Sequence, residues 1–541
     1  MNRALQLHQA GKLDPAEKLY RDILRVQPAN SDALHLLGLV HLASSRYKEA
    51  ERLIAKAVQM YPGVASYQNS LGRALQGQGK LTEAAAVYRG ALQIDSNLAE
   101  AHSNLGSVFV ATGQLEDASA CYQRAVQLRP TYVDALSDWG AVLRRLGRLD
   151  EAEHVLREAI VMRDDHLAAY VNLGAVLQEQ GQHQQAMACL ARALELDPKN
   201  PQVFNNLGLA LHASGRLPDA LASFDCALAL DPQFGNAHWN RSLTLLLSGD
   251  LEHGWEEYEW RWQSSDFPSP RRDFAQPAWT GEPLDGRTIL IHAEQGLGDT
   301  IQFARYLLLV AQRGGRVVFE CPADLVRLLQ GIDGLAEIVP QSGPLPAFDV
   351  QAPLLSLPHI FETRPDSIPA AGLKLNLAAR YVERLRDCPR PLVGLIWAGS
   401  PHNKIDRRRS MGLRDMAPLT RLTGLTFVAL QKGAAGQQAA EPPAGMRLLD
   451  LGPELDDFTD TAAVLSQLDA VVSVDTAAAH LAGALGRPVC LLLPAVPDWR
   501  WLLGSETTPW YPTMRLFRQR RAGDWSEVLE RLVAHLSYLT Q

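Results

Sequence analysis

The 541-residue sequence has few cysteines, no long apolar run and no excess of basic residues, and each absence excludes a class of protein. The six cysteines are scattered without a C-x-x-C pair, so we expect reduced thiols rather than disulfides or a metal site. No apolar stretch reaches the roughly 18 residues that cross a bilayer, and the first thirty or so residues show neither the apolar region nor the cleavage site of a signal peptide. A net charge of −8 argues against nucleic-acid binding. We therefore expect a cytoplasmic protein without a transmembrane segment.

The first half of the chain is dominated by a repeat of 34 residues. Small residues at fixed positions allow two antiparallel helices to approach closely, and a left-handed residue is needed where the first helix of each pair ends. The pattern resembles the tetratricopeptide repeat and predicts an α-solenoid over residues 1–265, with an atypical last unit that caps the stack. The first glycine of each unit stands at 38, 72, 106, 140, 174 and 208, and the second at 79, 113, 147, 181, 215 and 249.

Three tryptophans, Trp255, Trp260 and Trp262, are concentrated in the last unit. Because a terminal repeat is atypical in order to cover the end of the stack, we expect them to pack the solenoid onto the next domain. A platform on which a sugar ring stacks is the alternative interpretation.

One polar position lies on the first helix of each unit, two residues before the first glycine. It holds Asn104, Asn172 and Asn206, and also Asn240 in the last unit, where Ser242 replaces the glycine. On the concave face of a solenoid, a row of amides could bind the backbone of an extended peptide, which is similar to the asparagine ladder of the eukaryotic O-GlcNAc transferase. Asparagine is also common at this position of the repeat for no functional reason, and both interpretations stay open.

After a proline-rich linker at 266–286, short apolar runs alternate with helices. Strands are predicted at 288–293, 316–320, 392–397, 425–430, 470–474 and 489–493, with a further short element at 348–355. Strands that alternate with helices indicate parallel sheets. Two such series predict two Rossmann-like lobes with a cleft between them, at 287–378 and 391–525, followed by a C-terminal helix at 526–541.

The first strand leads into the turn Gln-Gly-Leu-Gly-Asp-Thr at 295–300, which opens a helix. A G-x-G turn between a strand and a helix is typical of dinucleotide sites, but Ile301 stands where the third glycine of that motif belongs. Gly296 and Gly298 are therefore weak indicators of nicotinamide or flavin binding. Asp299 also has the position of a helix cap, which is its structural interpretation.

A stronger pattern begins where a later strand ends, at Asp475 and Thr476. Three alanines, the first of them Ala477, open a helix that contains His480. The free N–H groups and the positive end of such a helix bind phosphates, and small side chains let the phosphates approach. Asp475 and Thr476 could instead serve only as caps. His480 lies one turn into the helix, where it could reach a phosphate.

The run from Asp475 to Pro488, together with Gly298 and Asp299, resembles the ADP-heptose heptosyltransferases of lipopolysaccharide synthesis over residues 287–525. The resemblance implies a GT-B-like pair of lobes in which Asp299 is the general base. The family's D-T-G-x-x-H stretch, which binds the donor pyrophosphate, maps onto Asp475, Thr476, Ala477 and His480. Alanine at 477 replaces the glycine of that stretch.

The same resemblance implies further donor contacts, among them Gly296 and Gly298. A cationic residue is expected after the first strand of the second lobe, near Ser400. Its candidates are Lys404 and the run Arg407–Arg409, of which Arg409 is favoured. Gln431 and Lys432, at a strand end, are expected to contact the donor as well.

The short first lobe and the repeats depart from that family and argue against a lipid acceptor. We expect a glycosyltransferase that moves a sugar from a nucleotide-sugar, with an ADP-sugar such as ADP-heptose favoured, to a hydroxyl of a protein or peptide held by the repeats. The second half contains no Asp-x-Asp motif, which favours a single inverting displacement without a metal. No cofactor besides the nucleotide-sugar co-substrate is expected. The alternative is a non-catalytic repeat scaffold for protein–protein interaction, with a degenerate nucleotide-binding domain.

Overall fold

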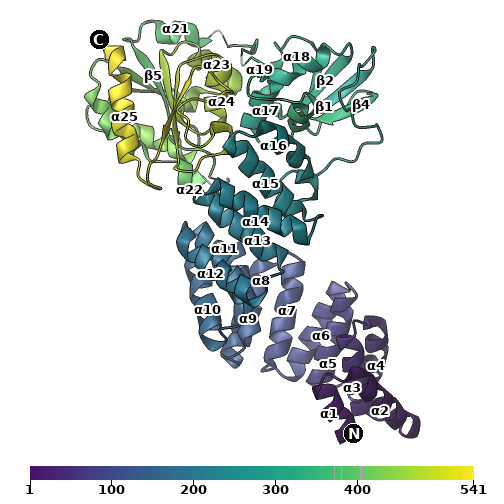
Figure 1. Cartoon of the computed structure of the whole chain (residues 1–541). Coiled ribbons are helices and arrows are strands. Elements are labelled where there is room, and N and C mark those ends of the chain that lie inside the picture. Colours follow the sequence, from purple (N-terminus) through teal and green to yellow (C-terminus); the bar gives the residue numbers. More distant parts are fainter. Residues whose placement is uncertain (371, 379, 402–405, 541) are drawn as a thin grey trace. The chain divides into compact units, whose positions relative to one another are not determined.

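The computed structural model describes residues 1–370, 372–378, 380–401 and 406–540 (Figure 1). The chain consists of two compact units, Met1–Ala210 and Leu211–Gln541. The division falls inside a repeat helix, α13 (Pro201–Ala213), ahead of residue 265, where the sequence pattern places the end of the solenoid. The last repeat helices therefore belong to the same compact unit as the sheets.

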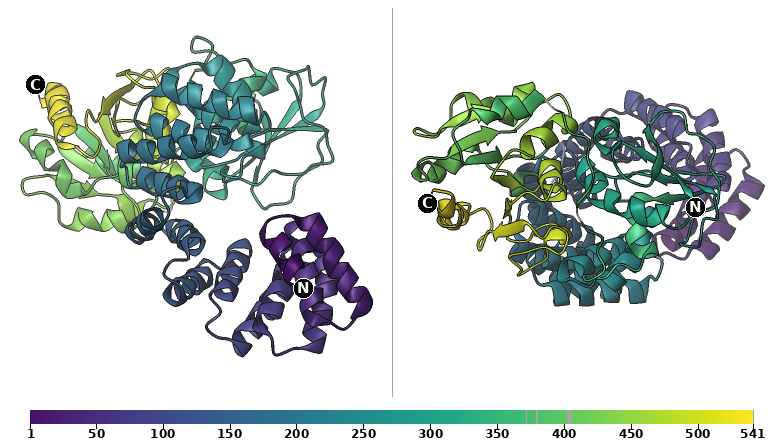
Figure 2. Two further views of the ribbon diagram at one scale, coloured as in Figure 1. Left: turned by 60° about the horizontal axis from the view of Figure 1, so that its bottom comes forward. Right: turned by 90° about the horizontal axis from the view of Figure 1, so that it is seen from above.

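The first unit is a succession of helix pairs, which Figure 2 shows packed one after another. Each pair corresponds to one unit of the sequence repeat, as predicted. The helices are α1 (Asn2–Gln9), α2 (Leu13–Val26), α3 (Ser31–Ala43), α4 (Tyr47–Met60), α5 (Ala65–Gly77), α6 (Leu81–Ile94), α7 (Ala99–Ala111), α8 (Leu115–Leu128), α9 (Val133–Arg145), α10 (Leu149–Met162), α11 (Leu167–Glu179) and α12 (His183–Leu196).

The repeated small residues explain how the helices of a pair pack. A β-carbon on Gly72 would come within 2.5 Å of the Tyr88 ring, so only glycine permits this approach. The second glycine of each unit is left-handed, with φ from +75° to +94°, and Ser45 adopts φ +55° in the unit that lacks this glycine. Twelve periodic alanines are completely buried between the helices: Ala50, Ala57, Ala84, Ala91, Ala118, Ala125, Ala152, Ala159, Ala186, Ala193, Ala220 and Ala227.

The second unit starts with the remaining repeat helices and continues into a sheet of four parallel strands in the order β3-β2-β1-β4. The register places Ile291 of β1 opposite Phe319 and Ala352, so β1 is a central strand of this sheet. The elements are α14 (Leu217–Leu230), α15 (Gly235–Ser248), α16 (Leu251–Tyr258), the 3-10 helix η1 (Glu259–Gln263), β1 (Thr288–His292), α17 (Leu297–Phe303), α18 (Leu307–Ala311), β2 (Arg316–Cys321), α19 (Ala323–Leu329), β3 (Leu335–Pro340), β4 (Val350–Pro353) and α20 (Leu357–Ile360).

A second sheet comes next, with six parallel strands in the order β10-β9-β8-β5-β6-β7. Figure 1 shows its strands beside α23, α24 and the C-terminal helix α25. The elements are α21 (Arg380–Arg386), β5 (Leu392–Ile396), α22 (Asp406–Arg409), η4 (Leu413–Arg421), β6 (Thr426–Ala429), η5 (Ala434–Ala440), β7 (Leu448–Asp450), α23 (Phe458–Leu465), β8 (Ala470–Val474), α24 (Ala477–Ala484), β9 (Val489–Leu493), η7 (Trp499–Trp501), β10 (Met514–Arg518) and α25 (Ser526–Leu536).

Three strands, β3, β7 and β10, were not predicted, and all three lie at sheet edges. An edge strand has fewer buried neighbours than a central one, so it needs no continuous apolar run and leaves a weaker sequence signal. The strand at 489–493, the last one predicted, does not close the series as expected, because β10 pairs with β9 on its outer side.

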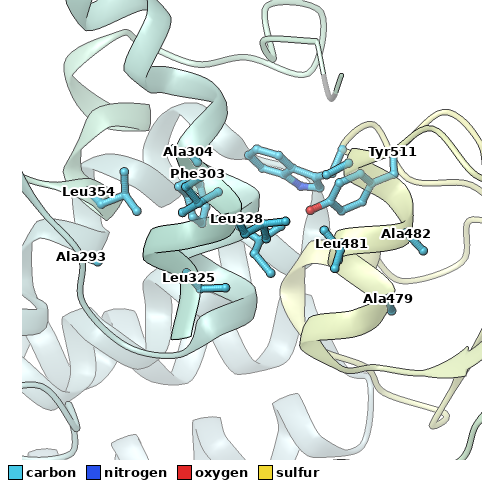
Figure 3. Close-up of a cluster of buried hydrophobic side chains, with 14 of the residues drawn as sticks. Ala293, Phe303, Ala304, Leu325, Leu328, Leu354, Ala479, Leu481, Ala482 and Tyr511 are labelled. Carbon is cyan, nitrogen blue, oxygen red and sulfur yellow. The ribbon is translucent and has the colours of Figure 1, made fainter. Parts of the chain in front are cut away.

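One hydrophobic cluster joins the terminal repeat helices to the elements around both sheets. Figure 3 shows part of it, with Phe303 and Leu328 on one side and Leu481 and Tyr511 on the other. Within this core, α17 packs against α24. These two helices come directly after β1 and β8, so their packing brings together the two turns that the sequence singles out.

A membrane-spanning helix, a metal-binding cluster and a disulfide are all absent from the residues that the structure describes. No helix there combines the length and the apolar composition that would let it cross a membrane. No three His, Cys, Asp or Glu side chains are grouped there in a way that could hold a metal ion. All six cysteines are described and none is in a disulfide.

Candidate active site

The turn after β1 carries the first group of candidate residues. Gln295 is left-handed, with φ +64°, and the chain enters α17 directly after Gly296. Asp299 lies in the first turn of α17, and one of its carboxylate oxygens accepts a hydrogen bond from the Gly296 N–H at 2.8 Å. Asp299 is therefore a helix cap, but this role uses only one of its two oxygens.

The turn after β8 carries the second group. Thr476 is the N-cap of α24, and its hydroxyl accepts from the Ala479 N–H at 3.3 Å. His480 is buried, with its Nδ1 3.0 Å from the Tyr511 hydroxyl and its Nε2 3.8 Å from the Asp475 carboxylate. The imidazole is therefore held inside the protein rather than extended toward solvent.

The two turns meet at Gly298. A β-carbon there would lie 2.9 Å from the His480 ring and 3.5 Å from the Ala477 backbone, so glycine allows α17 and α24 to approach each other. Both turns lie where the strand order reverses, since β1 separates β2 from β4, and β5 separates β8 from β6. Parallel sheets bind ligands in the crevice at such points.

Arg500 of η7 binds the helix that follows the first turn, and sequence reasoning missed it. This residue of η7 is 7% exposed, and its guanidinium donates to Asp299, to Asp498 at 2.8 Å and to the Gln302 side chain at 2.6 Å. It also stacks on Trp499 at 4.2 Å. The only signal in the sequence is an arginine within an aromatic run, which indicates packing and gives no hint of its partner about two hundred residues away.

Burial dominates the electrostatics of this site. It raises the pKa of Asp299 above its usual value, although the neighbouring Arg500 opposes the shift. It also raises the pKa of Asp475 to about 6, and repulsion from Asp498 adds to the effect. The pKa of His480 lies well below its usual value, because the ring is buried beside Arg500. A carboxyl whose pKa is raised carries its negative charge less readily, so the raised pKa values of Asp299 and Asp475 reduce the repulsion that an incoming anion would meet.

The loop after β5 carries the candidates for the predicted cationic contact. A β-carbon on Gly399 would lie 2.3 Å from Asp406 and 2.8 Å from the Arg409 guanidinium, so α22 folds tightly over this loop. The Arg409 guanidinium lies 3.8 Å from the Asp475 carboxylate. Ser400 is exposed at the start of the loop, and the other candidate, Lys404, lies outside the described residues. The structure thus brings Arg409 to the Asp475 turn.

Gln431 and Lys432, after β6, have different surroundings. The Gln431 side-chain oxygen accepts from the Trp397 and Ala398 N–H groups at 3.0 and 2.9 Å, so this side chain ties β5 to β6. Lys432 is exposed, and its ammonium donates to the Leu455 carbonyl. An open depression beside it is lined by Gly433, Gly436, Gln437, Asp450, Gly452 and Pro453, among others.

The terminal repeat contacts the Gly296 turn through buried polar groups. Arg261 of η1 is completely buried and donates to Glu294 at 2.9 Å. One residue further, the Gln295 amide donates to the Tyr258 hydroxyl at 2.6 Å. Burial raises the pKa of Glu294 to about 7, against the attraction of Arg261. The last repeat therefore supports the turn that carries the candidate base.

The three tryptophans of the last repeat have separate roles. Trp255 packs edge-on against Phe303 of α17 at 5.8 Å, which confirms its predicted packing on the next domain. Trp260 stacks on His238 within the repeat at 3.8 Å, and Trp262 meets a phenylalanine of the linker at 5.2 Å. The packing role therefore belongs to Trp255.

Three asparagines at the repeat position hydrogen-bond to other side chains. Asn104 and Asn172 donate to side-chain oxygens of the preceding unit at 2.9 and 3.2 Å. Asn206 accepts from Gln202 at 2.9 Å. These three side chains are half-buried, whereas Asn240 is 7% exposed and withdrawn from the surface.

Family models match both parts of the chain. "Tetratricopeptide repeat" models match residues 132–199, 2–65, 171–233 and 205–252, and a "TPR repeat" model matches 72–113 and 106–147. "Glycosyltransferase family 9 (heptosyltransferase)" matches residues 427–496. This last segment includes Lys432, Asp475 and His480 but neither Asp299 nor Arg500.

Individual proteins also match parts of this chain. Protein FlbA of Caulobacter vibrioides is 28% identical over 325 residues, which cover 53% of this chain and 52% of FlbA, so the chain spans about half the length of that relative. The solved APC/C hetero-tetramer Cut9-Hcn1 matches at 18% identity over 46% of this chain and 49% of that chain, with a TM-score of 0.40. YrrB, a TPR protein with an unusual peptide-binding site, matches at 24% identity over 34% of this chain and 95% of its own, with a TM-score of 0.30. The chain is thus a tetratricopeptide-repeat protein fused to a glycosyltransferase domain that resembles the heptosyltransferases.

Proposed function

We propose that residues 287–525 form a GT-B-like glycosyltransferase, with the four-stranded lobe on the acceptor side and the six-stranded lobe on the donor side. The observation that carries the proposal is the approach of the Asp299 turn to the Asp475 turn through Gly298. The first turn supplies a carboxylate, and the second supplies a helix start that suits a diphosphate. The family 9 match over 427–496 supports sugar transfer as the chemistry.

In the proposed reaction, Asp299 takes the proton of the acceptor hydroxyl while that oxygen attacks the anomeric carbon of the donor. The bond between this carbon and the diphosphate oxygen breaks in the same step, so the anomeric centre is inverted. Burial raises the pKa of Asp299 toward the working pH, which favours a general base. Arg409 and the first N–H groups of α24 stabilise the leaving diphosphate. The chemistry is metal-independent, consistent with the lack of an Asp-x-Asp motif in residues 266–541.

The donor in this proposal is a nucleotide-sugar, and an ADP-sugar is favoured by the resemblance to the heptosyltransferases. Its diphosphate lies on the turn formed by Asp475, Thr476 and Ala477. The depression beside Lys432, at the carboxyl ends of β6 and β7, receives the nucleoside. Gln431 shapes the floor of this depression through its bonds to the backbone after β5, and does not contact the donor.

The acceptor is a hydroxyl of a protein or peptide held by the repeats. Asn104, Asn172 and Asn206 are partly ordered by bonds to neighbouring residues, so little side-chain entropy is lost when they bind a peptide backbone. We expect Asn104→Ala with Asn172→Ala to reduce labelling of proteins in a cell lysate while donor binding stays unchanged. Gln123→Ala, an exposed change on α8, is the matched control. Equal labelling by both variants would remove the ladder from the proposal.

The donor is tested by thermal unfolding in the presence of ADP, UDP, GDP and their sugar conjugates. A ligand at about 100 times its Kd stabilises the folded state by about 2.7 kcal/mol, which is readily measured. Stabilisation by one nucleotide family supports the enzyme and identifies its donor. If no nucleotide stabilises the protein, the scaffold alternative is favoured. Ala477, which replaces a glycine of the family motif, gives that alternative its basis.

The role of Asp299 is tested by Asp299→Asn. We expect turnover to fall by about 10²-fold or more, because the general base is lost while the side chain keeps its shape. Asp415→Asn is the matched control, since Asp415 caps Gly412 N–H at 2.7 Å in the same way that Asp299 caps Gly296 but lies outside the site. Turnover that is equal in the two variants would refute the assignment.

A further inference from the structure

Arg500 hydrogen-bonds to side chains from two separate parts of the second unit. Its side chain comes from the six-stranded part of the unit, yet it reaches across to α17, where it donates to Asp299 and to Gln302. A third bond, to Asp498, and the stacking on Trp499 fill the remaining sides of the guanidinium. The candidate base is thus bound to a cation.

This ion pair opposes the proposed role of Asp299 as the general base. Its two carboxylate oxygens accept from the Gly296 N–H and from Arg500. A carboxylate in a charge-assisted hydrogen bond holds a proton poorly, so the ion pair opposes proton removal from an acceptor. Asp299 becomes a stronger base once Arg500 binds another partner, because Arg500 opposes the rise of its pKa.

The start of α24 lies close to Arg500. The Trp501 ring, one residue after Arg500, lies 5.2 Å from the His480 ring in the first turn of α24. Arg500 binds Asp299, and a β-carbon on the adjacent Gly298 would lie 2.9 Å from the His480 ring. The guanidinium is therefore close to the turn where the diphosphate is proposed to bind. An arginine binds a phosphate oxygen at least as well as it binds a carboxylate.

We propose that the donor diphosphate takes Arg500 from Asp299, so that donor binding itself releases the base. This inference rests on the proposed function and adds a residue and an order of events to it. Arg500 becomes a ligand of the diphosphate, and Asp299 keeps only its bond to the Gly296 N–H. The acceptor hydroxyl then meets an active base only when a donor is present, which makes binding ordered with the donor first.

The exchange is tested by a double-mutant cycle of binding, without turnover. The full chain and its Asp299→Asn, Arg500→Gln and doubly substituted forms are titrated calorimetrically with ADP, UDP, GDP and inorganic pyrophosphate. We expect Asp299→Asn to tighten binding of the preferred diphosphate by about 5- to 10-fold, because the internal competitor is lost. We expect Arg500→Gln to weaken it by about 10-fold or more. In the Arg500→Gln background, Asp299→Asn is expected to change the affinity by less than about 2-fold.

Three results would overturn the inference. If Asp299→Asn tightens binding equally in both backgrounds, Asp299 repels the anion through space and does not compete for Arg500. If Asp299→Asn leaves the affinity unchanged or weakens it, no competition exists. Asp415→Asn, the cap control, should leave the affinity unchanged, and tighter binding by that variant would also overturn the inference.

The design separates failure of this inference from failure of the proposed function. Diphosphate binding with an additive cycle overturns only the exchange at Arg500, whereas no binding of any diphosphate overturns both. Because Arg500 is buried, Arg500→Gln is paired with Arg500→Lys, which keeps the charge but not the forked geometry. A folded Arg500→Lys protein should bind with intermediate affinity and retain part of the coupling to Asp299, and affinity equal to that of the unsubstituted chain would contradict a direct role.

Discussion

Removing Arg261 should destabilise the second unit in a way that depends on pH. Its guanidinium is completely buried and donates to Glu294 at 2.9 Å and to Ser356 at 2.7 Å. Arg261→Met fills a similar volume but leaves Glu294 without a cation. Breaking a buried ion pair by removal of one partner typically costs about 3–5 kcal/mol, because the remaining charge is uncompensated.

The pH dependence is set by the pKa of Glu294, which burial raises from 4.5 to about 7 in the folded protein. A carboxyl whose pKa is higher in the folded state binds its proton more tightly there, so its contribution to stability falls as the pH rises from 4.5 to the folded pKa. In the unsubstituted chain this decline ends near pH 7. Without Arg261 the folded pKa rises further and the decline continues above pH 7, at about 1.4 kcal/mol per pH unit.

We therefore expect Arg261→Met to cost about 1–3 kcal/mol at about pH 6, where Glu294 is largely protonated, and about 1–2 kcal/mol more at about pH 8.5. Urea unfolding followed by tryptophan fluorescence measures this, since ten of the eleven tryptophans lie in the second unit and only Trp139 precedes it. Arg261→Met with Glu294→Gln is the control, and its cost should not vary with pH. An equal cost of Arg261→Met at both pH values would refute the reasoning.

Three further predictions concern packing and chemistry. Gly72→Ala should lower the stability of the repeats by about 1–2 kcal/mol, because the new methyl group would meet a Tyr88 ring whose hydroxyl is bound to Gln76. Thermal unfolding followed by circular dichroism measures this. Gly63→Ala, where the space is open, is the control, and equal melting temperatures of the two variants would contradict the prediction. Trp255→Ala should cost about 3–5 kcal/mol in urea unfolding, since this side chain is 1% exposed, whereas the half-buried Trp260→Ala should cost clearly less. Addition of EDTA should leave turnover unchanged, and a loss that Mg²⁺ restores would exclude the metal-independent mechanism.

The sequence by itself determined the repeat array and the parallel strands of the second half. The 34-residue period is local, because each small residue acts on a helix 16 residues away, as Gly72 does on Tyr88. Central strands such as β1 and β8 are buried along their length and so appear as apolar runs, which was enough to place the two candidate turns. The family comparisons confirm the combination of repeats with a glycosyltransferase domain.

Only the tertiary structure decided which residues share the site. Arg500 and Asp299 are separated by about two hundred residues, and no local period or turn signal links them; α17 packing on α24 does. The same holds for Arg261 and Glu294, which place the last repeat helices in the compact unit of the sheets. It also holds for Gln431, whose side-chain oxygen accepts from backbone N–H groups after β5. Side-chain partners of this kind depend on how distant elements pack, and packing is a property of the folded chain that no short stretch of sequence contains.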